Sequence, residues 1–361
     1  MVSPSFRLFQ LPQVALKEML KLIDLNELFI LSLCSRRSSQ YVKLYYNKSL
    51  KWWMALYTYK PSPPEVRNGQ AGSYQTIVVV KESTELQYTE NVTVGDHTVP
   101  FVKTPESCEL YWDDQRVGLK IVVEYICELF NSFPSSLVTQ LPFLWMIELM
   151  NNPISITHVE TFHPNWDDGL PLREEECKYL ITTCKSCVFI LNIIFPEGFI
   201  YTGPFGKHEL FVISHGSWIT VDNLISMGET CIEINIRESK LTVADLNSFM
   251  KSWFNYKANT FRLIQITDKI LDIPAIFDGL EDAMVTVEGT MVYDNQEESV
   301  ELSKYVSLEF PAGHSVLRRD DGMIAAAALS DFGLFIAIWP DIGSIRENEI
   351  GKYKLNPIVN V

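Results

Sequence analysis

The chain has 361 residues, of which 45 are acidic and 30 are basic, and its formal net charge is −15. Apolar residues make up 47% and aromatic residues 12%, so the chain can bury a sizeable core, which excludes an intrinsically disordered protein. The acidic balance argues against nucleic acid as a partner, because phosphate contacts require a concentrated basic face.

The apolar stretches and the cysteines indicate the compartment. The opening MVSPSFRLFQ lacks the basic and apolar regions of a signal peptide. The apolar stretch 323–339 is interrupted by Asp331, and a charge there would be costly in lipid. Seven cysteines without a paired framework suit a reducing compartment. We therefore expect a cytoplasmic and/or nuclear protein with no membrane partner.

Residues 1–50 are basic, unlike the rest of the chain, with seven Lys/Arg and three Asp/Glu. Leu11-Pro12 predicts the start of a helix, because proline is tolerated at the first helical position. Apolar residues then recur at helical spacing and predict one apolar stripe, formed by Leu16, Met19, Leu20 and Ile23.

Two more helices are predicted in the same segment. Asp24 and Glu27 have the spacing of a capping box that opens a second helix, and Ser35 is a candidate start for a third. Three short helices cannot bury all of their leucines among themselves. The apolar surplus predicts either a helical cap packed on the rest of the chain or an interface for another protein.

This segment resembles an F-box. LPQVALKEMLKLIDLNELFILSLCSRRS (11–38) has the Leu-Pro opening, the leucine rhythm and the basic pair of that motif. The likeness covers residues 6–46 and departs from the usual pattern at Cys34 and Ser38, where valine and tryptophan are common. An F-box binds a Skp-family adaptor, which connects it to a cullin–RING ubiquitin ligase. The resemblance implies that the residues in the adaptor contact or in the F-box core are Leu11, Pro12, Leu16, Leu20, Leu25, Leu28, Leu31, Arg36 and Arg37.

A domain boundary is expected after the F-box. Residues 51–75 begin with an aromatic run and end in a Pro/Gly/Ser cluster, which predicts a helix tail and a linker between an F-box at 6–50 and a domain at 76–350. β-branched runs then predict strands, and helical spacing predicts a helix over 114–131. The predicted strands are 76–82, 85–94 and 97–103.

Beyond Pro153, short strand candidates recur at intervals of about 22 or 30 residues, with helical segments between several of them. The strand candidates are 156–161, 187–192, 209–214, 231–236, 261–266 and 283–288, and the helical segments are 173–184, 220–228 and 241–254. This order predicts right-handed crossovers to parallel strands. We expect a mixed α+β or α/β fold with irregular, leucine-rich-repeat-like strand–helix units, and a doubly wound α/β domain is the alternative.

A second resemblance lies in this region. Residues 238–266 (ESKLTVADLNSFMKSWFNYKANTFRLIQI) are similar to the most recognisable stretch of the type 2 F-box-associated domain, through Leu241, Thr242, Leu246, Asn247, Phe249 and Trp253. Residues 314–340 resemble its C-terminal Arg-Arg-Asp-Gly hairpin, which ends in Trp-Pro. That domain is described as the part that recruits a target protein.

No metal or catalytic site is predicted. Cys177, Cys184 and Cys187 supply only three thiolates, whereas zinc takes four ligands and no second close pair follows. No nucleophile elbow, phosphate-binding loop or dinucleotide fingerprint occurs, and nothing singles out a dyad of Cys231 and His215. We expect no cofactor and no enzymatic activity.

The two resemblances together imply a substrate-recognition adaptor of a Skp–cullin–F-box ubiquitin ligase. The F-box would bind the Skp-family adaptor, and the C-terminal domain would recruit an unknown target protein. One alternative is an F-box scaffold or sequestering protein that acts without ubiquitylation. A more remote alternative is a small-molecule enzyme with a helical cap.

Overall fold

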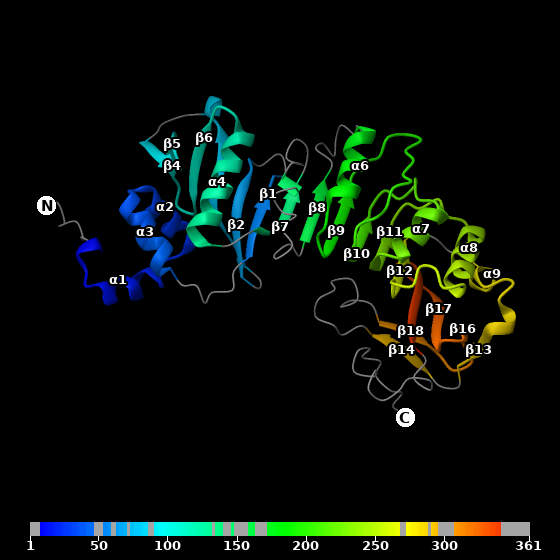
Figure 1. Ribbon diagram of the computed structural model, residues 1–361. Helices are drawn as coiled ribbons and strands as arrows, with labels where there is room; N and C mark the ends of the chain where they lie inside the picture. Colours follow the sequence, from blue (N-terminus) through cyan, green and yellow to red (C-terminus); the bar gives the residue numbers. More distant parts are fainter. Residues whose placement is uncertain are drawn as a thin grey trace. The chain divides into compact units, whose positions relative to one another are not determined.

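The computed structural model describes residues 8–46, 53–58, 63–70, 73–85, 90–131, 134–139, 146–147, 158–162, 172–267, 272–287, 290–294 and 307–340 (Figure 1). The chain divides into two compact units, residues 1–156 and 157–361. Each unit contains both helices and a sheet, which confirms the mixed α/β class. In the ranges just given, no helix is long and apolar enough to cross a membrane.

The first unit begins with short helices. They are the 3₁₀ turn η1 (Leu8–Gln10), α1 (Gln13–Leu20), α2 (Leu25–Leu33) and α3 (Arg36–Tyr45). The predicted helices therefore exist, although their identity as an F-box stays a prediction. The Ser35 side chain caps α3 by accepting a hydrogen bond from the Ser38 N–H at 3.1 Å. Asp24 precedes α2 but makes no capping bond through its side chain, so the predicted capping box is wrong in this detail.

A mixed sheet and one long helix complete this unit. The strands are β1 (Trp53–Tyr57), β2 (Glu65–Gln70), β3 (Ser73–Glu82), β4 (Glu90–Val94), β5 (His97–Lys103), β6 (Cys108–Trp112) and β7 (Pro134–Thr139), and the helices are η2 (Ser83–Glu85) and α4 (Gln115–Phe130). Their order in the sheet is β7-β1-β2-β3-β6-β5-β4, with β4 at the edge. Asp114 caps α4 by accepting from the backbone N–H of Arg116 at 2.9 Å.

β1 corrects the expected helix tail after residue 51. It pairs antiparallel with β2 and parallel with β7, and both Ala55 and Leu56 are fully buried. A strand that is buried on both faces reads as a continuous apolar run, which pattern alone cannot distinguish from a helix. β1, β2 and the start of β3 all lie within residues 51–75, where a linker was expected, while the predicted domain limits at 6–50 and 76–350 stay predictions.

The second unit contains a series of parallel strands in chain order. They are β8 (His158–Phe162), β9 (Val188–Asn192), β10 (His208–Ile213), β11 (Cys231–Ile236) and β12 (Leu263–Ile266). Each strand pairs in parallel with the next along the chain. The helices between or after them are α6 (Glu174–Thr183), α7 (Val221–Gly228), α8 (Val243–Phe254) and α9 (Ile273–Ile276). The strands and helices predicted between residues 156 and 266 are thus present.

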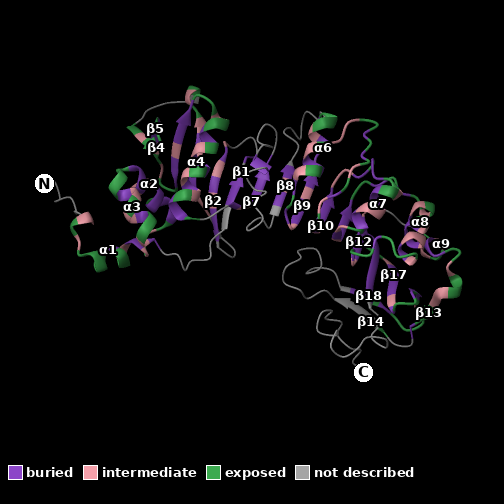
Figure 2. Ribbon diagram, in the orientation of Figure 1, coloured by how far each residue is buried: buried purple, intermediate pink, exposed green. Residues whose placement is uncertain are grey.

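The strand registers stack large apolar side chains in rows. Phe189 of β9 pairs with Phe211 of β10, which pairs with Ile234 of β11 and then Ile264 of β12. All four are buried, and the two phenylalanine rings stack at 5.2 Å. Figure 2 shows these strands in the colour of buried residues. Sequential parallel pairing agrees with the expected strand–helix units, whereas their leucine-rich-repeat-like nature stays a prediction.

An antiparallel segment ends the described chain. Its elements are η3 (Glu281–Ala283), β13 (Met284–Thr286), β14 (Met291–Asp294), β15 (Ser307–Phe310), β16 (Ser315–Arg318), β17 (Met323–Ser330) and β18 (Gly333–Pro340). β18 pairs antiparallel with β12 and continues the sheet in the order β12-β18-β17-β16-β13. The expected strand at 283–288 therefore exists as β13, but it pairs antiparallel with β16 and does not extend the parallel series.

Candidate functional site

The helices α1 to α3 pack on the rest of the first unit. Phe29 of α2 meets Tyr125 of α4 edge to face, with ring centroids 6.0 Å apart. The Tyr125 hydroxyl donates to Ser32 Oγ at 3.0 Å, and the Asn26 amide donates to the Glu106 carbonyl at 3.2 Å. The helices therefore contact α4, the turn between β5 and β6, and strand β3 of their own chain, as the helical-cap interpretation expects.

The residues predicted from the F-box resemblance fall into two groups. Four leucines are buried in the core of the first unit: Leu16, Leu20, Leu25 and Leu28. Leu11 and Leu31 are half-buried, whereas Pro12, Arg36 and Arg37 are exposed. The guanidinium carbon of Arg37 lies 5.5 Å from the centroid of the Tyr41 ring, so this basic residue contacts an aromatic side chain of its own helix. The pattern alone could not separate core leucines from surface leucines.

Position 38 holds a buried serine where many F-boxes have a tryptophan. Ser38 is almost fully buried, and its hydroxyl lies 2.6 Å from that of Ser35, which caps the same helix. A buried, hydrogen-bonded serine leaves a site of small volume, where an indole would not fit without rearrangement. Cys34, the other departure, is exposed at the end of α2.

Three large apolar side chains of this helical segment face solvent. Val14 is 75% exposed, Leu22 is 85% exposed and Leu44 is 62% exposed. We refer to Val14, Leu22 and Leu44 as the exposed apolar residues of the segment. The sequence pattern did not identify these residues, because an apolar stripe indicates only which side of a helix is buried. The signal available was that Leu22 falls outside the i, i+3, i+4, i+7 positions that begin at Leu16.

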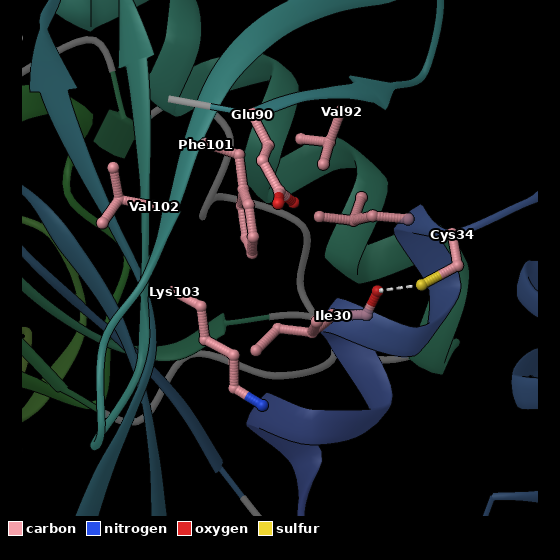
Figure 3. Close-up of a pocket in the computed structure, with 8 residues that line it drawn as sticks. Ile30, Cys34, Glu90, Val92, Phe101, Val102 and Lys103 are labelled. Carbon is pink, nitrogen blue, oxygen red and sulfur yellow. Dashed lines mark hydrogen bonds between the residues drawn. The ribbon is translucent and has the colours of Figure 1, made fainter. Parts of the chain in front are cut away.

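A groove of about 490 Å³ lies between α2 and the edge of the sheet (Figure 3). Ile30, Leu33 and Cys34 line it from α2, and the residues that line it from β4 and β5 are Glu90, Val92, Phe101, Val102 and Lys103. The Cys34 thiol donates to the Ile30 carbonyl at 3.5 Å. No sequence motif pointed to this groove, because strands and a helix far apart in the chain form it.

The cysteines and histidines do not form a reactive site in the part of the chain that the structure describes. All seven cysteines are free, and no group of three His, Cys, Asp or Glu side chains is placed to hold a metal. Burial, reinforced by the nearby Glu176 carboxylate, raises the pKa of Cys177 to about 12, so this thiol stays protonated at neutral pH. His215 Nδ1 lies 2.6 Å from Glu238, whereas the Cys231 thiol donates to the Gly206 carbonyl, so the two do not form the dyad considered above.

The residues that carry the second resemblance are structural. Thr242 caps α8 in a capping box with Asp245. The Asn247 amide donates to the carbonyls of Ile276 and Asp278, both at 2.9 Å, and so holds the segment after α9. The remaining residues of the motif are buried: Leu241, Leu246, Phe249 and Trp253.

Arg319 connects α8 to the C-terminal hairpin. Its guanidinium is 6% exposed and forms two hydrogen bonds with Asp321, at 2.9 and 2.6 Å. It also donates to the Trp253 carbonyl at 2.9 Å and to Asn259 Oδ1 at 2.7 Å. The same group lies over the rings of Trp253 and Tyr256, at 4.7 and 4.4 Å. The second arginine of the Arg-Arg-Asp-Asp run is therefore a structural residue.

Comparisons with known proteins support the second resemblance. Residues 205–264, which include β10, α7, β11 and α8, match the family model described as "F-box associated". The chain is also 22% identical over 299 residues to the Skn-1 dependent zygotic transcript 15 protein of Caenorhabditis elegans, an alignment that covers 77% of this chain and 84% of that protein. No solved structure matches the chain.

Proposed function

Because residues 205–264 carry an F-box-associated region, we propose that this chain is a substrate-recognition adaptor of a Skp–cullin–F-box ubiquitin ligase in the cytoplasm or nucleus. Its helices α1 to α3 would bind a Skp-family adaptor, and the second unit would hold a target protein. Catalysis would be carried out by the partners, and the adaptor would act by raising the local concentration of target lysines near the conjugating enzyme.

The observation that carries the proposal is the family match in the second unit together with the exposed apolar residues on the N-terminal helices. Val14 on α1, Leu22 in the turn after α1 and Leu44 on α3 expose large apolar side chains. Exposed apolar residues that gather on a small helical segment are a common property of protein interfaces. The four leucines in the core are not available to a partner, so we expect adaptor contacts from the exposed apolar residues, from Leu11, Pro12 and Leu31, and from the basic pair Arg36 and Arg37.

Binding to a purified Skp-family adaptor tests the proposal. Leu22→Asp places a carboxylate on the exposed apolar surface without touching the core, so we expect at least about a tenfold loss of affinity and little change in thermal stability. Val117→Asp, on the half-exposed side of α4, is the matched control and should bind as the wild type does. Wild-type affinity in Leu22→Asp, Val14→Asp and Leu44→Asp alike would refute the assignment.

The ligase link needs a separate measurement. If the adaptor binds but no cullin is recovered in the same complex, the scaffold or sequestering alternative is correct. In cells, a chain that carries Leu22→Asp should still bind its target but should no longer shorten the half-life of that target.

A further inference from the structure

β4 is an edge strand, because no further described strand pairs with its outer side. It pairs antiparallel with β5, from Glu90 opposite Phe101 to Val94 opposite His97, and with no other described strand. An edge strand presents a row of backbone N–H and C=O groups to any extended chain that approaches it. Such a row is complementary to one kind of partner, a second β-strand.

The hairpin geometry shows which residues point their backbone groups outward. Gly95 and Asp96 connect β4 to β5, and Gly95 has φ +59°, as expected for the first central residue of a two-residue type II′ turn. In such a turn the flanking residues, Val94 and His97, exchange backbone hydrogen bonds. Because bonded and non-bonded pairs alternate along an antiparallel ladder, the N–H and C=O groups of Thr93 and Asn91 point away from β5.

The groove next to this edge supplies room for side chains. Glu90 and Val92 share the face of β4 that is turned toward α2, and Ile30 and Leu33 form the opposite wall. Figure 3 shows the side chains of Glu90 and Lys103 extending from the strands into the space before α2. An added strand on β4 would therefore place alternate side chains in an apolar groove.

Charge further defines the occupant. Neither Glu90 nor Lys103 forms an ion pair with another described residue, and both line the groove beside its apolar walls. An occupant that complements this site carries an apolar side chain with charged residues beside it, including a carboxylate for the Lys103 ammonium. A purely apolar segment would leave both charges desolvated without partners, at a cost.

We propose that β4 and the α2 groove form a docking site for an extended peptide segment of another protein, which adds to the sheet as a new edge strand. Backbone hydrogen bonds to Asn91 and Thr93 provide affinity, and the groove selects one apolar residue flanked by charged ones. None of the exposed apolar residues, Val14, Leu22 and Leu44, lines this groove, and the docking site does not depend on the function proposed above.

One pair of variants separates strand addition from other contacts. Thr93→Pro removes an outward N–H that the β4–β5 ladder does not use, and proline is tolerated at such edge positions. Thr93→Ala changes the same side chain but keeps the N–H. Circular dichroism and the thermal midpoint of both full-length variants establish that the fold is retained.

Cys34 provides a probe inside the groove. It is the exposed thiol of the chain, whereas the other cysteines are buried or half-buried. Short random peptides without cysteine, displayed on phage, are selected on the full-length protein. The selected peptides are then synthesised, and the rate at which iodoacetamide alkylates Cys34 is measured with and without each peptide.

We expect peptides that slow Cys34 alkylation at least about tenfold, bind Thr93→Ala like the wild type and bind Thr93→Pro at least about tenfold more weakly. Their sequences should share one apolar residue beside charged ones. The proposal is overturned if no selected peptide protects Cys34, or if the protecting peptides bind Thr93→Pro as tightly as the wild type. A concentration-dependent dimer of the free protein that Thr93→Pro dissociates would overturn it in favour of pairing between two copies.

The same variants keep this inference distinct from the proposed function. Leu22→Asp should weaken adaptor binding at least about tenfold and leave peptide binding unchanged. Thr93→Pro should do the opposite. If one of the two proposals fails, the other can therefore still be tested.

Discussion

Arg319 makes a set of contacts that no other side chain can make together, because a planar guanidinium combines ring stacking with several directed hydrogen bonds. We expect Arg319→Lys to lower the free energy of unfolding by about 2 kcal/mol, since lysine keeps the positive charge but cannot reproduce the paired hydrogen bonds to Asp321 or the ring stacking. Urea unfolding of the full chain measures this loss. Arg318→Lys, at an exposed neighbouring position, should change stability by less than about 0.5 kcal/mol. Equal effects of the two substitutions would contradict the structural role.

The ion pair of Arg319 with Asp321 makes the contact between α8 and the C-terminal hairpin sensitive to low pH. Burial by itself raises the pKa of Asp321, but the hydrogen bonds and the charge of Arg319 outweigh it and hold this pKa below its usual value. A carboxyl group whose pKa is lower in the folded state than in the unfolded state stabilises the fold at pH values above the unfolded pKa of about 3.9. This stabilisation is lost as the pH falls through the pKa of the folded state. The difference in unfolding free energy between wild type and Asp321→Asn should thus be constant near neutral pH and shrink below about pH 4. A difference that stays the same in strong acid would argue against this connection.

The capping boxes of α7 and α8 set the start of these helices. In each box a threonine hydroxyl accepts from the backbone N–H three residues on, from Asn223 to Thr220 and from Asp245 to Thr242. Thr220→Ala and Thr242→Ala should each cost about 1 kcal/mol. Ser248→Ala, on the exposed side of α8, is the control and should be nearly neutral. Denaturant unfolding at neutral pH compares them.

The elements that depend on neighbouring residues could be predicted from the sequence, whereas the elements that depend on pairing between distant segments could not. The helical segment that becomes α8 and the strand runs of β9 to β12 could be predicted directly, since both are properties of a few neighbouring residues. β1 could not, because its apolar run becomes a strand only through pairing with β2 and with β7, about 80 residues away. The same limit applies to the candidate sites. The leucine rhythm identified α1 to α3, but the exposure of Leu22 and the groove beside β4 depend on how α2 packs against the sheet.

The two compact units predict how the molecule divides. A chain cut at residue 76 would lose β1 and β2 from between β7 and β3, and would lose the helices that pack on α4. We expect residues 157–361 to unfold cooperatively as an isolated fragment, whereas residues 76–361 should show a disordered or aggregating N-terminal part. Circular dichroism and amide hydrogen exchange on both fragments test this expectation. A well-folded 76–361 fragment with every amide of β3 to β7 protected would show that α1 to α3 and β1 to β2 are dispensable for the first unit.

The strand order of the second unit also has a consequence for synthesis on the ribosome. β9 to β12 can each dock on the strand made just before, so the parallel series can grow as the chain emerges. β12 must wait for its other neighbour, because Ile266 pairs with Leu334 of β18. At translation rates of about 5–20 residues per second, this interval lasts on the order of ten seconds. During that time the nascent chain presents an unpaired, apolar sheet edge. We therefore expect that translational pausing in this interval increases aggregation more than pausing elsewhere in the chain.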